Sequence, residues 1–192
     1  MSLVMTSGPA VEPVTLAEAK AHLRIDHANE DALINSLIIT SRHHIEAALG
    51  LALITQSWTL LTDRWPKLQR LNLPLRPVQS ISSVKIWNHD GTSTTLPLSA
   101  FYLDGQGLPA RLAWQGAAPL SDPERAVNGI EIAFTAGFGS GADSVPQPVR
   151  HALLLLVAHW YEHREPVEIG SGVNAVPNMV SELLLPFRRR RM

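Results

Sequence analysis

The sequence predicts a single α+β domain, in which a small helical bundle carries an inserted β-rich segment. Segments at both ends of the chain have the start signals and the apolar spacing of helices, whereas the middle third consists of short, partly alternating stretches. With 192 residues, of which 45% are hydrophobic, the chain is long enough to bury a core of its own. We therefore expect one domain that spans residues 1–192.

Four helices are expected, at about residues 15–25, 29–49, 145–164 and 177–187. Thr15 and Glu18 have the spacing of a capping box at the start of the first helix, and Gly50 supplies a stop for the second. Ser144 and Gln147 repeat the capping spacing before the third helix. That third helix is apolar around most of its circumference, which predicts a place at the centre of the bundle or against a neighbouring subunit.

The β-rich insertion is expected at about residues 57–135. Its strands are predicted from β-branched and aromatic residues in short runs, at Ser57–Asp63, Ile81–Trp87, Thr92–Leu98, Phe101–Asp104 and Gly129–Thr135. Seven prolines between positions 66 and 123 interrupt this region, which favours a small antiparallel sheet or sandwich over one large sheet.

Composition excludes several classes of protein. The chain has no cysteine, so a disulfide scaffold and thiolate chemistry are both excluded. The N-terminal residues lack the pattern of a secretory signal, and the longest apolar run, residues 152–158, is too short to cross a bilayer. A soluble protein without a membrane partner is expected. The charged fraction of 17% is low, as in proteins that bury surface against other subunits.

Charge is unevenly distributed along the chain. Residues 188–191 are four consecutive arginines, and without them the chain has 12 basic and 17 acidic residues, a net charge of −5. An acidic body with a basic tail predicts that the tail has a partner of its own.

The stretch HWYEH contains His159, Glu162 and His163 in the H-x-x-E-H order of inverted zinc peptidases. A zinc hydrolase is therefore one alternative. Such an enzyme needs a further protein ligand, and the 29 residues after His163 hold three acids in unsuitable places, Glu165, Glu168 and Glu182. We interpret the stretch as the end of a packed helix, where histidine and arginine complement the helix dipole. No catalytic residue, metal site or cofactor is predicted.

The C-terminal stretch predicts a docking tail at residues 183–192. It combines apolar anchors with cations that can bind carboxylates, namely Leu183, Leu184, Leu185, Pro186, Phe187, Arg188, Arg189, Arg190 and Arg191. A DNA-binding module is the alternative, because clustered arginines also neutralise phosphates. We favour protein docking, since the body is acidic and no aromatic stacking surface accompanies the arginines.

Five segments in order resemble the head–tail connector, or adaptor, proteins of long-tailed phages and of gene transfer agents. They read TLAEAKAHLRID, DALINSLIITSRHHIEAALG, QSWTL, PQPVRHALLLLVAHWYEHRE and LLLPFR. The resemblance covers both ends of the chain, whereas residues 58–143 match poorly. No single segment is diagnostic, and the specificity lies in the ordered set.

This resemblance implies a structural protein of a virion or phage-like particle, assembled in the bacterial cytoplasm and placed at the head–tail junction. Such proteins form a ring, typically of twelve subunits, between the portal protein and a tail-side connector or stopper protein. DNA passes through the ring without specific binding, which suits an acidic body.

Carried onto this chain, the resemblance makes Leu183–Arg191 the portal-docking segment. The helices at 30–49 and 146–164 would line the contacts between subunits. The residues expected there are Arg42, Glu46, Arg150, His159, Glu162, His163 and Arg164.

Overall fold

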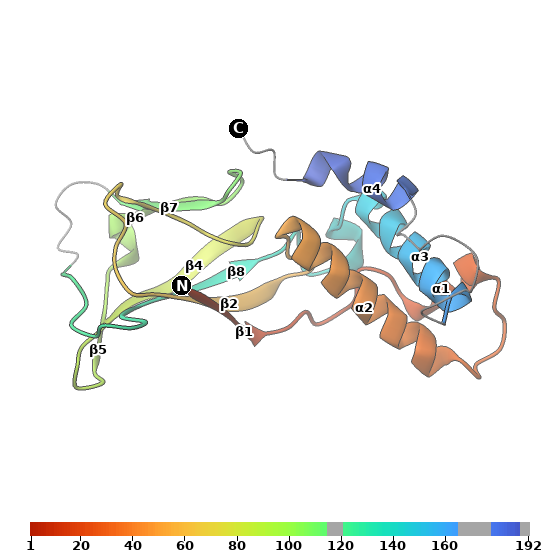
Figure 1. The fold of residues 1–192 in the computed structure, drawn as a ribbon, viewed down its shortest axis with the longest axis horizontal. Helices are drawn as coiled ribbons and strands as arrows, with labels where there is room; N and C mark the ends of the chain where they lie inside the picture. The colour runs from red at the N-terminus through yellow and green to blue at the C-terminus, as the bar shows by residue number, and fades with distance from the viewer. Residues whose placement is uncertain (115–120, 165–177, 189–192) are drawn as a thin grey trace, which may run out of the picture. The chain divides into compact units, whose positions relative to one another are not determined.

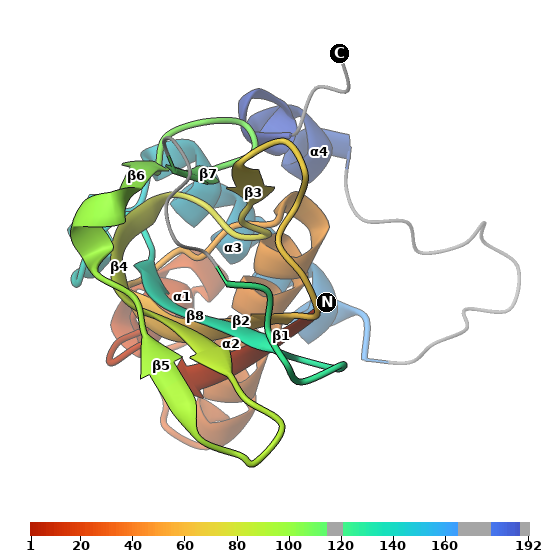
Figure 2. The same ribbon diagram turned by 90° about the vertical axis from the view of Figure 1, so that its left-hand side faces the viewer.

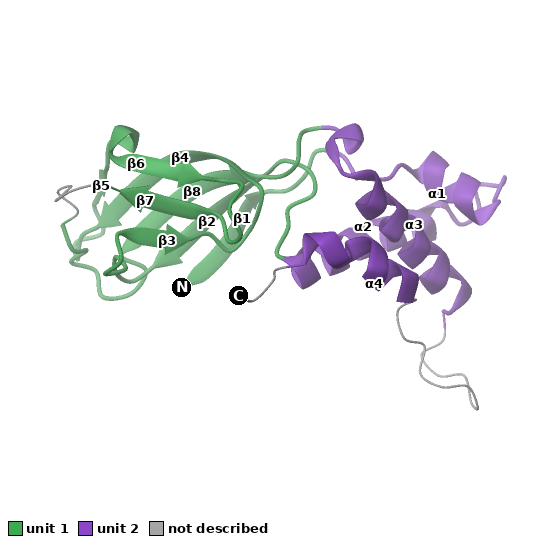
Figure 3. Cartoon of the chain, turned by 90° about the horizontal axis from the view of Figure 1, so that it is seen from above, with its two compact units in different colours: residues 1–10, 50–140 green, residues 11–49, 141–192 purple. Residues whose placement is uncertain are grey.

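The computed structural model describes residues 1–114, 121–164 and 178–188. The chain divides into two compact units, shown in Figure 3. Residues 1–10 and 50–140 form the β unit, and residues 11–49 and 141–192 belong to the helical unit. The β unit is thus inserted between the second and third helices, as expected, and it also includes the N-terminal residues.

The β unit contains two antiparallel sheets that lie one above the other (Figures 1 and 2). The larger sheet has the strand order β1-β2-β8-β4-β5, with β1 at Ser2–Ser7, β2 at Gln56–Thr62, β8 at Ile130–Ala136, β4 at Val78–Trp87 and β5 at Ser93–Thr95. The smaller sheet has the order β3-β7-β6, with β3 at Arg70–Asn72, β7 at Arg111–Trp114 and β6 at Phe101–Asp104. A short 3-10 helix, η1 at Leu98–Ala100, precedes β6.

The core of the β unit lies between the inner faces of the two sheets. Strand β8 alternates strictly between buried and half-buried residues, which matches the two-residue period of a strand with one face in a core. Phe134 in this strand is 1% exposed and is paired with Trp58 in β2 and Ile81 in β4. Leu112 and Trp114 close the core from the smaller sheet.

The predicted strands are found with shifts of a few residues, but three strands were missed. Strands β3 and β7 are three and four residues long, too short to give an alternating pattern. Strand β1 is six residues long and pairs with β2, although five of its six residues are exposed. An edge strand with so little burial shows no apolar period, so its pairing depends on the rest of the sheet.

The helical unit consists of α1 at Leu16–Leu23, α2 at Asp31–Leu49, α3 at Gln147–Glu162 and α4 at Asn178–Leu184, with 3-10 helices η2 at Ala142–Ser144 and η3 at Leu185–Phe187. Helix α3 packs against α1, α2 and α4, which confirms its predicted central place (Figure 1). No helix in the described part of the chain is long and apolar enough to cross a membrane.

One predicted helix cap is confirmed and one is wrong. The Thr15 hydroxyl accepts from the backbone N–H of Glu18, and the Glu18 carboxylate accepts from the N–H of Thr15 at 2.8 Å. Before α3, however, the N-cap is Pro146, without a side-chain cap bond. The reason is local: Ser144 ends a 3-10 turn in which its N–H donates to the Gly141 carbonyl, so its hydroxyl is not at the helix start.

Candidate interaction surfaces

The C-terminal segment presents its apolar residues on two sides. Val180 and Leu184 are buried in the helical unit, where α4 packs against α3. Leu185 is 63% exposed and Met179 is 56% exposed, so these two side chains form the free apolar surface of the segment. The sequence analysis did not predict Met179 as an anchor. Met179 directly precedes the buried Val180, and adjacent residues of a helix lie on different faces.

The other described residues of the predicted docking tail are half-buried or exposed. Leu183 and Phe187 are half-buried, and Pro186 and Arg188 are exposed. Arg189, Arg190 and Arg191 lie outside the described residues. Of the predicted apolar anchors, Leu184 therefore serves the core of its own unit, whereas Leu185 is available to a partner.

Arg42 and Glu46, predicted at subunit contacts, lie inside the helical unit. Arg42 is 4% exposed, donates to Glu46 one turn later at 2.9 Å and to Glu12 at 2.8 Å. Burial opposes the positive charge, but the two carboxylates outweigh it and raise the pKa of Arg42. This cluster joins α2 to the segment before α1, which is a structural role within one chain.

Arg150 likewise binds within its own chain. Its guanidinium donates to the Pro13 carbonyl at 3.0 Å and pairs with Glu18 of α1. The hydrogen bond from the Thr15 backbone is the largest cause that lowers the pKa of Glu18, and Arg150 lowers it further. Helices α1 and α3 are therefore fastened at their N-terminal ends.

The HWYEH stretch forms the last turn of α3. The N–H of His163 donates to the His159 carbonyl at 3.0 Å, and Nδ1 of the same residue lies 2.9 Å from that oxygen. Trp160 is half-buried, and its ring meets the exposed His44 ring edge to face at 5.6 Å. Among the described residues, no three His, Cys, Asp or Glu side chains gather as metal ligands. Two acids considered as further ligands, Glu165 and Glu168, lie outside the described residues.

Arg164 follows this turn and links it to the start of α2. It pairs with Glu30 at 2.7 Å and lies over the Tyr161 ring, 4.6 Å from its centre. The Tyr161 hydroxyl also donates to Glu30, and this hydrogen bond lowers the pKa of the carboxylate. Glu162 is exposed and forms no ion pair with the described residues, so its carboxylate is free for a partner.

The outward face of α2 is uncharged, a feature that the sequence interpretation missed. After Asp31, the helix contains only two Lys, Arg, Asp or Glu residues, and both point into the unit. The exposed positions hold Ala32, Asn35, Ser36, Ile39, Thr40, His43, His44, Ala47 and Ala48. A helix face without charged side chains shares one feature with interface cores, which are depleted of charged residues.

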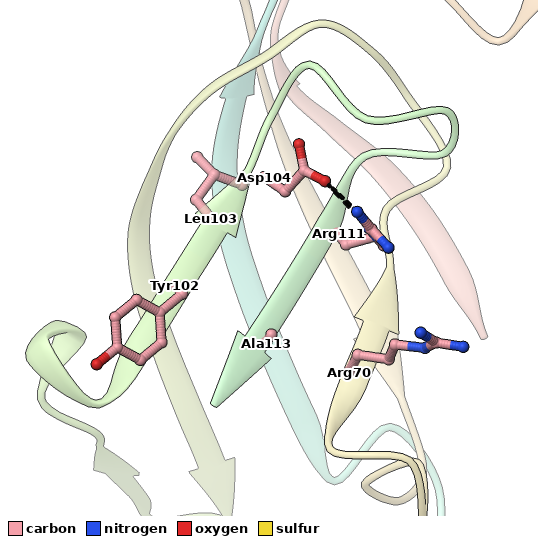
Figure 4. A pocket seen from close by; sticks show the side chains of 6 residues that line it. All are labelled: Arg70, Tyr102, Leu103, Asp104, Arg111 and Ala113. Carbon is pink, nitrogen blue, oxygen red and sulfur yellow. Dashed lines mark hydrogen bonds and ion pairs between the residues drawn. The ribbon is translucent and has the colours of Figure 1, made fainter. Parts of the chain in front are cut away.

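The outer face of the smaller sheet contains a shallow hollow of about 330 Å³ (Figure 4). Its lining comes from all three strands and consists of Arg70, Tyr102, Leu103, Asp104, Arg111 and Ala113. Asp104 and Arg111 pair at 2.5 Å, and Arg111 lowers the pKa of Asp104. Arg70 is exposed and forms no ion pair within the described residues.

The two units also differ in charge. The β unit has seven basic and six acidic residues, a net charge of +1. The helical unit, without its four terminal arginines, has five basic and eleven acidic residues, a net charge of −6. The acidic body that the sequence indicates is therefore the helical unit.

Comparison with known proteins gives one family and several solved structures. Residues 12–189 match the model of a family described as head completion protein. A chain from the neck of an empty gene transfer agent (GTA) particle with C6 symmetry is 27% identical, with a TM-score of 0.85, and the match covers 100% of this chain and 97% of that one.

Two further structures cover the same shares of the two chains at 26% identity. One is from the virion of a native GTA particle, with a TM-score of 0.85. The other is from the neck of a native GTA particle with C12 symmetry, with a TM-score of 0.82. No curated protein matches the chain.

Proposed function

The chain belongs to the head completion protein family, and from this premise we propose that it is a structural adaptor at the head–tail junction of a phage or gene transfer agent particle. The observation that carries this proposal is the match along the full chain, in both units, to chains from the necks of GTA particles. Its role is structural, and we propose that it has no catalytic activity. The experiment is to look for the protein in particle necks, and its absence from them would contradict the proposal.

A ring of copies is the assembly that this role requires. The similar chains come from necks with C6 or C12 symmetry, and a ring of twelve satisfies both. The uncharged outward face of α2 supports the ring, because it can be covered by a neighbouring copy without desolvating a charge. DNA would pass the acidic helical unit without adhering, because like charges repel its phosphates.

The C-terminal segment is proposed to dock to the portal protein, and a tail-side connector or stopper protein would bind elsewhere on the ring. Leu185 supports the docking, since it is a large apolar side chain, 63% exposed, directly before the arginines. An aliphatic side chain can anchor an interface when it fills a pocket on the partner, and arginine is enriched in binding hot spots. A deletion that removes Leu184 would not test docking alone, because Leu184 belongs to the core of the helical unit and its loss would also affect folding.

The test substitutes Leu185→Asp and measures binding to purified portal protein. We expect at least about a tenfold loss, equivalent to about 1.4 kcal/mol, from the lost apolar anchor. The matched control is Val127→Asp in the β unit, since Val127 is also 63% exposed. Equal binding by the two variants would contradict docking through this segment.

A deletion of residues 188–192 separates protein docking from DNA binding. We expect weaker portal binding and no change in the affinity for duplex DNA. A steep, salt-dependent DNA affinity that disappears with the arginines would instead support the DNA-binding alternative.

A further inference from the structure

We propose that the hollow on the smaller sheet is one half of the contact between neighbouring copies, in which Arg70 of one copy binds a carboxylate on the helical unit of the next. This proposal rests on the ring that is part of the proposed function. It adds the residue, the partner surface and the chemistry of that contact.

The hollow follows from the register of the three strands. Ala113 in the central strand is paired with Arg70 on one side and with Tyr102 on the other. Because Ala113 carries only a methyl group, the outer face of the sheet is low between two long side chains, as Figure 4 shows. Next to it, the Asp104–Arg111 pair forms a wall whose charges compensate each other.

Arg70 is the uncompensated charge in this hollow. It is exposed and makes no ion pair with a described residue, in contrast to Arg111. Tyr102 is 56% exposed, so a large aromatic surface stands free at the opposite margin. Arginine and tyrosine are enriched where proteins bind proteins, and a guanidinium binds a carboxylate through two parallel hydrogen bonds.

The helical unit supplies the complementary charge. Most of its described acids are already paired within the chain, including Glu12, Glu18 and Glu30. Four exposed acids form no ion pair within the described residues, and they are Asp26, Asp143, Glu162 and Glu182. These four carboxylates belong to the unit whose net charge is −6 before the terminal arginines.

A cyclic ring places these two surfaces in different copies. Each copy in such a ring contacts its neighbours through two different surfaces, which must be complementary to each other. A basic hollow on the β unit and unpaired acids on the helical unit satisfy that condition within one sequence. Charge pairs of this kind also select the correct neighbour and reject a like-charged surface.

The test is the charge reversal Arg70→Glu, produced in cells that assemble particles without the wild-type chain. The number of copies per particle is measured by quantitative mass spectrometry relative to a capsid protein. We expect at least about a tenfold decrease, because every contact in the ring then brings two negative charges together. The melting temperature of the purified variant stays unchanged, since Arg70 pairs with no described residue in its own chain.

The matched control is Arg64→Glu, which makes the same charge change at an exposed, unpaired arginine of the β unit outside the hollow. This variant should keep the wild-type number of copies. An equal loss in both variants, or no loss in Arg70→Glu, would overturn the proposal.

Rescue identifies the partner carboxylate. Asp26→Lys, Asp143→Lys, Glu162→Lys and Glu182→Lys are each combined with Arg70→Glu, and one of them should restore occupancy to within about twofold, because it recreates an opposite-charge pair. If none of the four restores it, the carboxylate does not come from this surface and the proposal fails. A wild-type chain that never enters particle necks would refute the proposed function itself, a result that is distinct from these.

Discussion

The two units of this protein use charge in different ways. The β unit has a core of apolar side chains between two sheets, and its ion pairs are exposed or half-exposed, as between Asp104 and Arg111. The helical unit places Arg42, 4% exposed, among its helices and ties their ends with Glu18 and Glu30. Two sheets cover each other over a broad apolar area, whereas short helices touch along narrow stripes.

This difference has a consequence for assembly. Because the helical unit uses charged residues inside, the outward face of α2 is left neutral and can be covered at little cost in desolvation. The β unit keeps unpaired cations outside, which favours contacts that depend on charge. The neutral outward face of α2 and the unpaired cations of the β unit are therefore two kinds of surface on one chain.

The largest effect is expected from the apolar core. Phe134→Ala should destabilise the β unit by about 3–5 kcal/mol, because it removes a fully buried ring and leaves a cavity. Four of the five tryptophans lie in this unit, so tryptophan fluorescence during chemical denaturation reports its unfolding. Helix unfolding, followed by circular dichroism, should keep its midpoint. A shift of both midpoints would show that the two units unfold together, which would contradict their description as units with separate cores.

A somewhat smaller effect is expected from the buried charge. Arg42→Met should destabilise the helical unit by about 3 kcal/mol, since Glu12 and Glu46 then lose their common partner. The control is Lys85→Met in the β unit, which breaks a half-exposed pair with Glu131 and should cost less than about 1 kcal/mol. The free energy of unfolding is measured by circular dichroism and fluorescence. Similar losses for the two variants would show that the buried ion pairs of the helical unit stabilise it no more than the half-exposed pair stabilises the β unit.

The elements that the sequence predicted are those with strong local signals. Helix α1 begins at a capping box, and α2 ends directly before Gly50, which adopts a positive φ of 63°. The strands of the larger sheet with a buried face, such as β8, show the alternation that predicts them. Strand β1 carries no such signal, because its pairing with β2 is a contact between residues fifty or more positions apart.

The interaction surfaces were harder to predict for a related reason. A charged residue on a helix was expected outside, yet Arg42 and Glu46 point inward, because Glu12, thirty residues away from Arg42, completes their pairing. The hollow around Ala113 depends on the register of three strands, two of which were not predicted. Periodicity shows that a face exists, whereas the partner of each charge depends on contacts between distant residues.

The smallest effect concerns the acid sensitivity of the helical unit. The pKa of Glu18 in the folded chain lies below its usual value of 4.5, chiefly through the Thr15 backbone hydrogen bond. Its stabilisation is therefore fully present above pH 4.5 and is lost as the pH falls through the lower folded pKa. Glu18→Gln should lower the free energy of unfolding by less than about 1 kcal/mol at pH 7, because the carboxylate is partly exposed.

The same variant should differ less and less from the wild type as the pH falls, and the two should converge once the wild-type carboxyl is protonated. Circular dichroism during denaturation at a series of pH values measures this difference. The conservative variant Asp63→Asn in the β unit is the control, since Asp63 accepts only the N–H of Asn128 among the described contacts. A constant gap between Glu18→Gln and the wild type at all pH values would mean that Glu18 acts through its shape and not through its charge. The contact between α1 and α3 would then depend on packing and not on charge, as the core of the β unit does.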